Sequence, residues 1–342
     1  MASARARHPA GCCATVAADA AVDFVSRLDA HHLSVYRAMP GDLLAELTTD
    51  IPAVRARSAE LAAAVARPPW PDDIATEDHH TPSADGTDVL VRIYRPASAP
   101  SPAPALYWVH GGGLVMGSVA QNDDMCAAIA DRLGIVVASV EYRLAPEHPY
   151  PTPLENCYAG LQWVAGRGDE LGIDRTRIAV GGASAGGGLA AGLALLARDR
   201  GEVAVCFQLL VYPMLDDRNV TPSSHTIVDP KVWNREANAA GWNAYLAGRA
   251  GADDVAPYAA PARATDLAGL PPTYIDVGDL DLFLDEDVAY AQGLMRAGVP
   301  VELHVYPGAF HGSNNFVSRS DLSRRWNADE RAALARALGV EA

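Results

Sequence analysis

The stretch that decides the fold is residues 181–188, GGASAGGG, which surrounds Ser184 with glycines directly after a short apolar run at 178–180. Gly182 and Gly186 flank the serine in the spacing G-x-S-x-G, and small residues at these points let a strand turn sharply into a helix. Such a turn would hold the Ser184 hydroxyl at the end of a sheet. A glycine-rich loop whose serine only caps the next helix has the same five residues. The motif therefore needs support from the rest of the chain.

The composition is that of a globular protein and limits what it binds. The chain has 342 residues, 49% of them hydrophobic and 20% charged, enough for a large core. Its formal net charge of -15 opposes binding to phosphate backbones or anionic lipid, which requires clustered Lys and Arg. No stretch approaches the ~20 apolar residues of a membrane helix, and the first residues lack the apolar core of a signal peptide. We expect neither a nucleic-acid partner nor a membrane anchor.

The cysteines indicate a reducing compartment. There are five, an odd number, and none of them forms a CxxC pair. This pattern favours reduced thiols over a disulfide framework or a zinc site. We therefore expect a cytoplasmic protein without a metal, and the cysteines in question are Cys12, Cys13, Cys126, Cys157 and Cys206.

Strand and helix patterns alternate along most of the chain. Helical periodicity occurs between apolar runs, for example at 123–132, 189–197 and 285–296, and a final amphipathic helix is expected at about 320–338. Such alternation predicts an α/β fold with a mainly parallel sheet and helices on both faces. The predicted strands are 89–93, 105–109, 135–140, 178–180, 203–211, 273–277 and 301–306.

Two segments depart from the alternation. Residues 1–75 are Ala-rich and helical in pattern, with one helix expected at 51–65 before the prolines Pro68, Pro69 and Pro71 end it. Residues 213–260 carry several aromatic residues and a helical stretch at 231–246. We expect these two segments to cover a core that is formed by residues 76–212 and 261–342.

Polar residues follow four of the predicted strands. Because ligands of parallel sheets bind at the carboxyl ends of the strands, the residues at these ends are the candidates for chemistry. Serine is a weak nucleophile and needs a base, which His311 could provide. A carboxylate on the other ring nitrogen would fix the tautomer, and we choose Asp281. Asp279 and Asp285 are alternatives, since either could instead cap a helix.

Besides the nucleophile and the histidine–carboxylate pair, the reaction requires N–H groups that stabilise the negative charge developing on the substrate oxygen. The glycine run after residue 109 supplies Gly112 and Gly113, and Ala185 adds an N–H at the positive end of the serine helix. His110 is expected to hold this loop in place. A phosphate loop would need GK[ST] after the glycines, and that sequence is absent.

A dinucleotide-binding motif is a competing interpretation. Gly186, Gly188 and Ala191 satisfy G-x-G-x-x-A. In such a fold, however, the first glycine makes the turn out of the strand, and Gly182 and Ser184 already occupy that place. We therefore reject this interpretation.

Five blocks, in one order, resemble the hormone-sensitive-lipase family (family IV) of bacterial carboxylesterases. The resemblance implies an α/β-hydrolase with a mainly parallel eight-stranded sheet flanked by helices, and a helical cap formed by residues 1–75 and 213–260. It also implies hydrolysis of short- to medium-chain carboxylic esters through an acyl-enzyme, without a cofactor. The blocks are HGGGL at 110–114, EYRLAPEHPYP at 141–151, RIAVGGASAGGGLAA at 177–191, DLDLFLDE at 279–286 and PGAFHG at 307–312.

Position by position, the resemblance assigns the same site residues as the argument above. The triad would be Ser184, Asp281 and His311, and its nucleophile, acid and histidine follow one another in the order typical of this fold. The oxyanion hole would be formed by Gly112, Gly113 and Ala185.

Three residues depart from the family pattern. Ala183 stands where Asp or Thr is usual, Leu114 where an aromatic residue is common, and Leu282 where Pro often follows the acid. None of these changes removes a catalytic group, so they affect substrate preference. We expect the substrate pocket to include Leu114, Trp233, Met214 and Leu282.

Other functions of the same fold remain alternatives. A lactonase, amidase or thioesterase would use the same triad. A non-catalytic ligand receptor is a further alternative, but receptors of this family lack the triad histidine, which this chain keeps as His311. The expected partner is a small-molecule ester, and a homodimer is left open.

Overall fold

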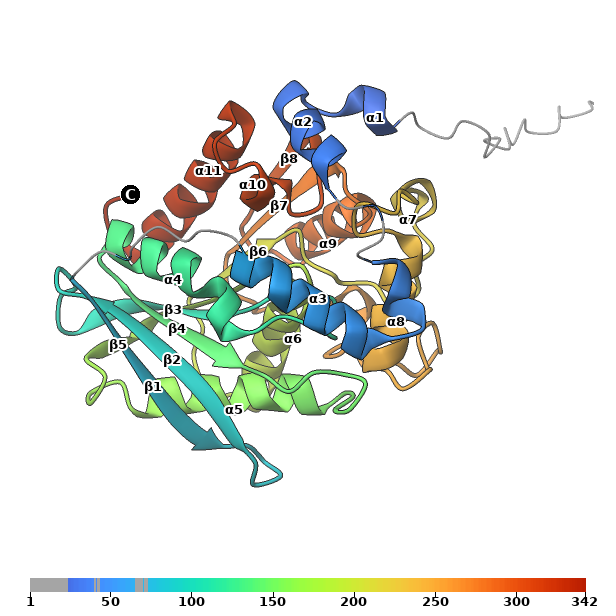
Figure 1. Cartoon of the computed structure of the whole chain (residues 1–342). Coiled ribbons are helices and arrows are strands. Elements are labelled where there is room, and N and C mark those ends of the chain that lie inside the picture. Colours follow the sequence, from blue (N-terminus) through green and yellow to red (C-terminus); the bar gives the residue numbers. More distant parts are fainter. Residues whose placement is uncertain (1–23, 40, 42–43, 65–69, 71–72) are drawn as a thin grey trace, which may run out of the picture.

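The computed structural model describes residues 24–39, 41, 44–64, 70 and 73–342. Cys12, Cys13, Pro68, Pro69 and Pro71 lie outside the described residues. The first described elements are helical and lie over one side of the sheet (Figure 1). They are α1 (Phe24–Arg27), α2 (Ala30–Ala38), the 3-10 helix η1 (Ala45–Thr48) and α3 (Ile51–Ala64).

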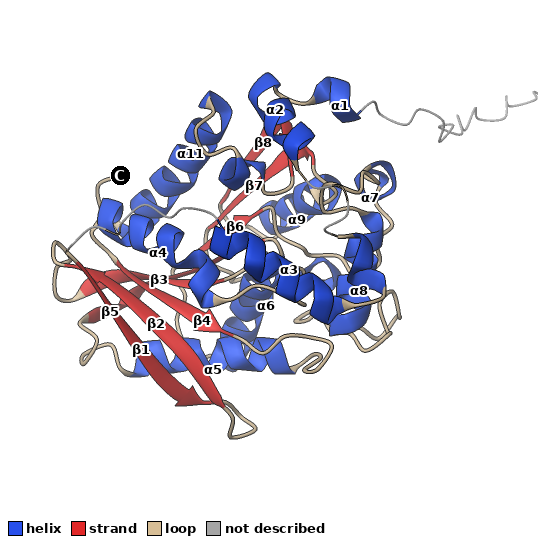
Figure 2. Ribbon diagram, in the orientation of Figure 1, coloured by secondary structure: helices blue, strands red, loops and turns tan. Residues whose placement is uncertain are grey.

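The centre of the molecule is one eight-stranded sheet in the order β1-β2-β4-β3-β5-β6-β7-β8 (Figure 2). Only the pairs β1/β2 and β2/β4 are antiparallel, and the other pairs are parallel. The predicted α/β-hydrolase sheet is therefore confirmed. The strands are β1 (Ile74–Pro82), β2 (Asp88–Pro96), β3 (Ala103–Val109), β4 (Val136–Glu141), β5 (Ile173–Ala183), β6 (Phe207–Val211), β7 (Thr273–Leu280) and β8 (Val301–Phe310).

Strand β1 is the element that the hydrophobic pattern did not reveal. Its sequence, IATEDHHTP, is almost entirely polar, and most of its side chains are exposed because it lies at the edge of the sheet. It is held by its register with β2, from Ile74↔Pro96 to Pro82↔Asp88. The strand begins before residue 76, where we expected the core to start.

Helices cover both faces of the sheet. Helices α4 (Val119–Leu133) and α11 (Asp321–Leu338) lie on one face, whereas α5 (Thr152–Gly166), α6 (Ala185–Arg200) and α9 (Leu284–Arg296) lie on the other (Figure 1). Each face has its own apolar cluster of buried side chains. Burial of these clusters, at roughly 25 cal/mol per Å² of apolar surface, is the main force that holds the layers together.

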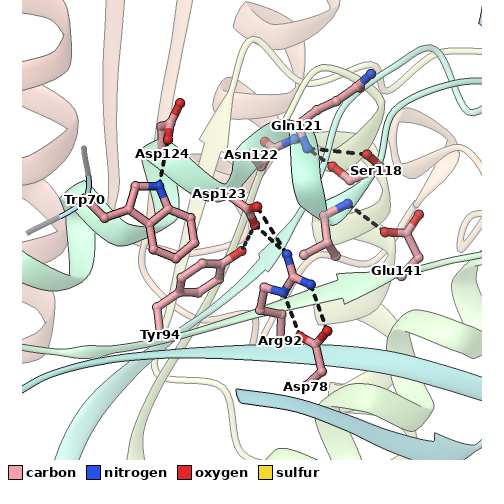
Figure 3. A network of polar contacts seen from close by, with 11 residues as sticks. Trp70, Asp78, Arg92, Tyr94, Ser118, Gln121, Asn122, Asp123, Asp124 and Glu141 are labelled. Atoms are coloured by element: carbon pink, nitrogen blue, oxygen red, sulfur yellow. Dashed lines mark hydrogen bonds and ion pairs between the residues drawn. The ribbon is translucent and has the colours of Figure 1, made fainter. Parts of the chain in front are cut away.

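A polar network fixes the start of α4 (Figure 3). Arg92 on β2 bridges Asp78 on β1 at 2.6 Å and Asp123 on α4 at 3.0 Å, and the Tyr94 hydroxyl donates to Asp123 at 2.6 Å. The Glu141 carboxylate accepts the first N–H of the helix, from Val119, at 2.7 Å. Since α4 follows the loop that contains residues 111–113, this network determines where that loop ends.

The segment between β6 and β7 carries α7 (Pro222–Thr226), α8 (Arg235–Tyr245) and the 3-10 helix η2 (Pro261–Arg263). It contacts the N-terminal helices, because the Tyr36 hydroxyl donates to Asp229 at 2.7 Å. A buried ion pair connects the two ends of this segment, with Arg263 Nε 2.5 Å from the Asp217 carboxylate. The same carboxylate accepts the Gly251 N–H at 2.7 Å.

The buried pair gives a prediction for stability. Arg263→Met should lower the free energy of unfolding by about 3–5 kcal/mol, because Asp217, whose side chain is fully buried, loses its counter-charge. The matched control is Arg249→Met, which removes an exposed pair with Asp254 and should cost about 0–1 kcal/mol. Urea unfolding followed by circular dichroism measures both. Equal losses for the two variants would contradict the interpretation.

Candidate active site

The turn between β5 and α6 places Ser184 at the carboxyl end of the sheet. Its backbone has φ 58° and ψ −123°, a conformation that non-glycine residues rarely adopt. A Cβ on Gly182 would lie 2.3 Å from the Gly186 oxygen, and one on Gly186 would lie 2.1 Å from the Val109 oxygen. Both positions therefore require glycine. The strained turn holds the serine hydroxyl above the edge of the sheet, where other side chains can reach it.

Ser184, His311 and Asp281 form one chain of hydrogen bonds. His311 Nε2 lies 2.9 Å from Ser184 Oγ, and His311 Nδ1 lies 2.8 Å from the Asp281 carboxylate. Asp281 is fully buried, and its second oxygen accepts the Phe283 N–H at 3.0 Å. The three side chains come from the ends of β5, β7 and β8, as the sequence predicts.

The two alternative carboxylates make other contacts. Asp279 pairs with Arg27 at 2.6 Å and accepts the Gly308 N–H at 2.7 Å. Asp285 accepts the Ser223 N–H at 2.6 Å. Of the three candidates, only Asp281 is hydrogen-bonded to His311 in the described structure.

Two aromatic rings fix the plane of the imidazole. Tyr212 and Phe283 meet the His311 ring edge to face, with centroids 4.8 and 5.1 Å away. Tyr212 follows β6 and has a φ of 34°. Sequence reasoning did not single it out, and the only available signal was that an aromatic residue follows a predicted strand.

The glycine loop carries two of the three N–H groups that were predicted for the oxyanion hole, and the third belongs to Ala185, the first residue of α6. Gly112 and Gly113 have φ values of 124° and 60°. A Cβ on Gly113 would lie 2.1 Å from the Trp233 ring, so the indole packs directly against this glycine. Among the described residues, the N–H groups of Gly112, Gly113 and Ala185 donate no hydrogen bond to a backbone carbonyl of a turn, loop or helix cap. That these N–H groups meet a substrate oxygen stays a prediction.

His110 supports the loop, as we expected. Its ring is fully buried and stacks on Tyr142 at 4.2 Å, and the Tyr142 hydroxyl donates to the His110 carbonyl at 2.9 Å. Burial lowers the pKa of His110 to about 4, so the ring is neutral at pH 7. A neutral imidazole that is fixed in this way positions the loop without adding charge.

Arg55, on α3, holds the far side of the same loop and was missed by the sequence analysis. Its guanidinium donates to the carbonyls of Val115 and Ala145 and pairs with Glu147 at 2.8 Å. Val115 in turn donates its N–H to the Gly112 carbonyl at 3.1 Å. An arginine in an Ala-rich helix gives no sequence signal for such a role, because its partners lie far away along the chain.

The four residues expected in the substrate pocket lie close to this site. Trp233 covers Gly113, and its Nε1 donates to Asn238 at 3.2 Å. Leu114, Met214 and Leu282 are almost completely buried, with exposed fractions of 2%, 1% and 0%. Their contact with a substrate stays a prediction.

A buried carboxyl anchors the loop that follows β6. Glu286 on α9 accepts the N–H groups of Leu215 and Asp216 at 2.8 and 3.1 Å. Burial, together with the negative charge of Asp216, raises the pKa of Glu286 well above its usual value. This contact joins the loop after β6 to the helix that follows Asp281.

The comparisons with known proteins agree with this architecture. A hydroxyl, an imidazole, a carboxylate and free N–H groups at one edge of a parallel sheet define an ester hydrolase of the α/β type. A family model described as alpha/beta hydrolase fold matches residues 106–315. The chain belongs to this family and, within it, to the hormone-sensitive-lipase group that its motifs resemble.

The relatives are esterases. Esterase LipI of Mycobacterium tuberculosis (strain ATCC 25618 / H37Rv) is 42% identical over 223 residues, which are 65% of this chain and 69% of the relative. Carboxylesterase NlhH of the same strain is 38% identical over 268 residues, 76% of this chain and 82% of the relative. The solved structure of Bacterial Heroin Esterase has a TM-score of 0.87 at 43% identity and covers 92% of this chain and 99% of its own. The chain is therefore a serine carboxylesterase.

No helix among the described residues has the length and apolar character needed to cross a membrane.

The contacts of Arg55 predict an effect on catalysis. Arg55→Met should lower kcat for p-nitrophenyl butyrate roughly 10- to 100-fold, a loss of about 1.4–2.8 kcal/mol of transition-state stabilisation, because the loop loses its fixed position. KM should change little, since the N–H groups act mainly on the transition state.

The matched control is Arg37→Met, which removes an exposed arginine from the neighbouring helix α2. This control should keep the parent kcat. A normal kcat for Arg55→Met would show that the loop does not depend on this contact.

Proposed function

We propose that this carboxylesterase acts through Ser184 as nucleophile, His311 as general base and acid, and Asp281 as the orienting carboxylate. The observation that carries the proposal is the unbroken pair of hydrogen bonds, 2.9 Å from Ser184 to His311 and 2.8 Å from His311 to Asp281. As Ser184 Oγ attacks the ester carbonyl, His311 Nε2 accepts its proton and then donates it to the leaving alcohol. Water repeats the sequence, and the acid leaves.

The negative charge of the tetrahedral intermediate would be met by the N–H groups of Gly112, Gly113 and Ala185. Ala185 is the first residue of α6, so the positive end of the helix adds to its effect. One such donor stabilises a transition state by about 3–4 kcal/mol. Because the loop is held by His110 and Arg55, little reorganisation accompanies the reaction.

The role of the serine is tested by covalent labelling. The whole chain should react with a fluorophosphonate to give one adduct on Ser184 and should turn over p-nitrophenyl esters. Ser184→Ala should lose both properties. The matched control is Ser139→Ala, a buried serine on β4. A folded parent enzyme with neither labelling nor turnover would sink the proposal.

The choice of acid is tested by two isosteric variants. Asp281→Asn should lower kcat by roughly 10³–10⁴, because the amide cannot hold the required histidine tautomer. Asp279→Asn keeps its size and should lower kcat far less, since Asp279 contacts Arg27 and Gly308 and not His311. Steady-state kinetics on p-nitrophenyl butyrate decide between them. If Asp279→Asn caused the larger loss, Asp281 would not be the acid.

We propose that the substrates are uncharged esters with short to medium acyl chains. The net charge of -15 disfavours anionic substrates, and Trp233 covers one side of the site at Gly113. A series of p-nitrophenyl esters from acetate to palmitate should show the highest kcat/KM between two and eight carbons, with Trp233→Ala moving the optimum to longer chains. An optimum at palmitate for the parent enzyme would contradict this proposal.

We propose a cytoplasmic location and a small-molecule ester as the only partner that the reaction needs. Cys126, Cys157 and Cys206 all carry free thiols, which supports a reducing environment.

A further inference from the structure

A cavity lies on the opposite face of the sheet from the serine helix α6. It occupies about 170 Å³ between α4 and α11. Its apolar wall is formed by Trp108 and Leu209 from the sheet and by Met125 and Ile129 from α4. None of the residues Ser184, Asp281 and His311 lines it. The cavity therefore belongs to a different part of the molecule from the site described above.

The strand β5 carries small residues between the two strands that line the cavity. Strand β5 runs between β3 and β6, the two strands that contribute Trp108 and Leu209. Ala179 and Ala183 belong to the apolar cluster of this face, and a Cβ on Gly181 would lie 3.1 Å from the Leu209 Cβ. The strand between the two lining strands thus presents nothing larger than a methyl group here. Ala183, the unusual residue before the nucleophile, is one of these three.

Two arginines give the cavity its charge. Arg132, at the end of α4, and Arg331, on α11, both line it. Within the described part of the chain, neither guanidinium has a carboxylate within 4.0 Å. Burial and the nearby Arg132 charge lower the pKa of Arg331, whereas the charge of Glu330 raises it. Such a pair is notable in a chain with a net charge of -15.

One carboxyl group, that of Glu330, also lines the cavity. Burial and the negative charge of Asp276 raise the pKa of Glu330 well above its usual value, and the positive charge of Arg331 opposes that rise. The carboxyl group accepts a hydrogen bond from Asn314 at 3.1 Å. The cavity is thus lined by apolar side chains on one side and by two arginines and the Glu330 carboxyl group on the other.

We propose that this cavity binds a short aliphatic monocarboxylate. Its hydrocarbon chain lies among Trp108, Met125, Ile129 and Leu209, and its carboxylate lies between Arg132 and Arg331. Arginine suits this task because its planar group donates two parallel hydrogen bonds to a carboxylate. A volume of about 170 Å³ suits a ligand smaller than the drug-sized molecules that fill pockets of roughly 300 Å³ or more.

The ligand has the chemistry of the acid that ester hydrolysis releases. The cavity also borders the catalytic region, because its wall residue Asn315 donates to the Tyr212 hydroxyl at 2.9 Å, and the Tyr212 ring contacts His311. A bound carboxylate would thus lie next to the residues that orient the histidine.

The proposal is tested with hexanoate as the probe and the full-length enzyme. Isothermal titration calorimetry should detect one hexanoate per chain, and hexanol, which lacks the charge, should bind at least tenfold more weakly.

Arg132→Gln and Arg331→Gln should each raise the Kd at least tenfold. Ala128→Phe, which keeps both charges but fills the cavity from α4, should abolish binding. Arg296→Gln, which removes an exposed arginine from α9, is the matched control and should keep the parent Kd.

Thermal unfolding of each variant shows whether it is folded, and crystals soaked in 6-bromohexanoate locate the ligand by the anomalous signal of bromine. Bromine beside Trp108 supports the proposal, and bromine only at Ser184 overturns it. Unchanged binding in the folded Ala128→Phe variant, equal affinity for hexanol, or no binding to the parent enzyme would each overturn it too.

Discussion

The structure depends on a steric constraint at the turn from β5 into α6. Gly182 and Gly186 have no space for a side chain, since each faces a backbone oxygen at a distance that a Cβ cannot occupy. This tight turn forces Ser184 into a strained conformation. The conformation persists because β5 lies between two other strands and α6 is buried along most of its length. The cost of the strain is offset by the packing of α6, which is buried from Ala185 to Ala197.

Around this turn, each reacting group is fixed by a neighbour from a distant segment. Tyr212 and Phe283 hold the ring of His311, Arg55 holds the glycine loop, and Glu286 holds the loop after β6. These contacts come from α3, from the residues that follow β6 and β7, and from α9. The groups at this edge of the sheet are therefore held in place by the folded chain itself.

Much of this arrangement could be predicted from the sequence, because the relevant signals are local. Glycine spacing reveals the turn at Ser184, apolar runs reveal the buried strands, and the position of a polar residue after a strand reveals Asp281 and His311. Strand β1 could not be found in this way, since an exposed edge strand has no apolar alternation. The role of Arg55 was also hidden, because it depends on carbonyls of Val115 and Ala145 that only the fold brings near.

The N-terminal helices contact the end of β8, so their position is mechanically coupled to that of the histidine that follows this strand. The Asp29 N–H donates to the Gly308 carbonyl at 3.0 Å, and Arg27 pairs with Asp279, which binds the Gly308 N–H. Gly308 lies near the end of β8, three residues before His311. The N-terminal helices are thus joined to the strand that leads into His311. A change that displaces these helices would therefore also shift the position of the imidazole.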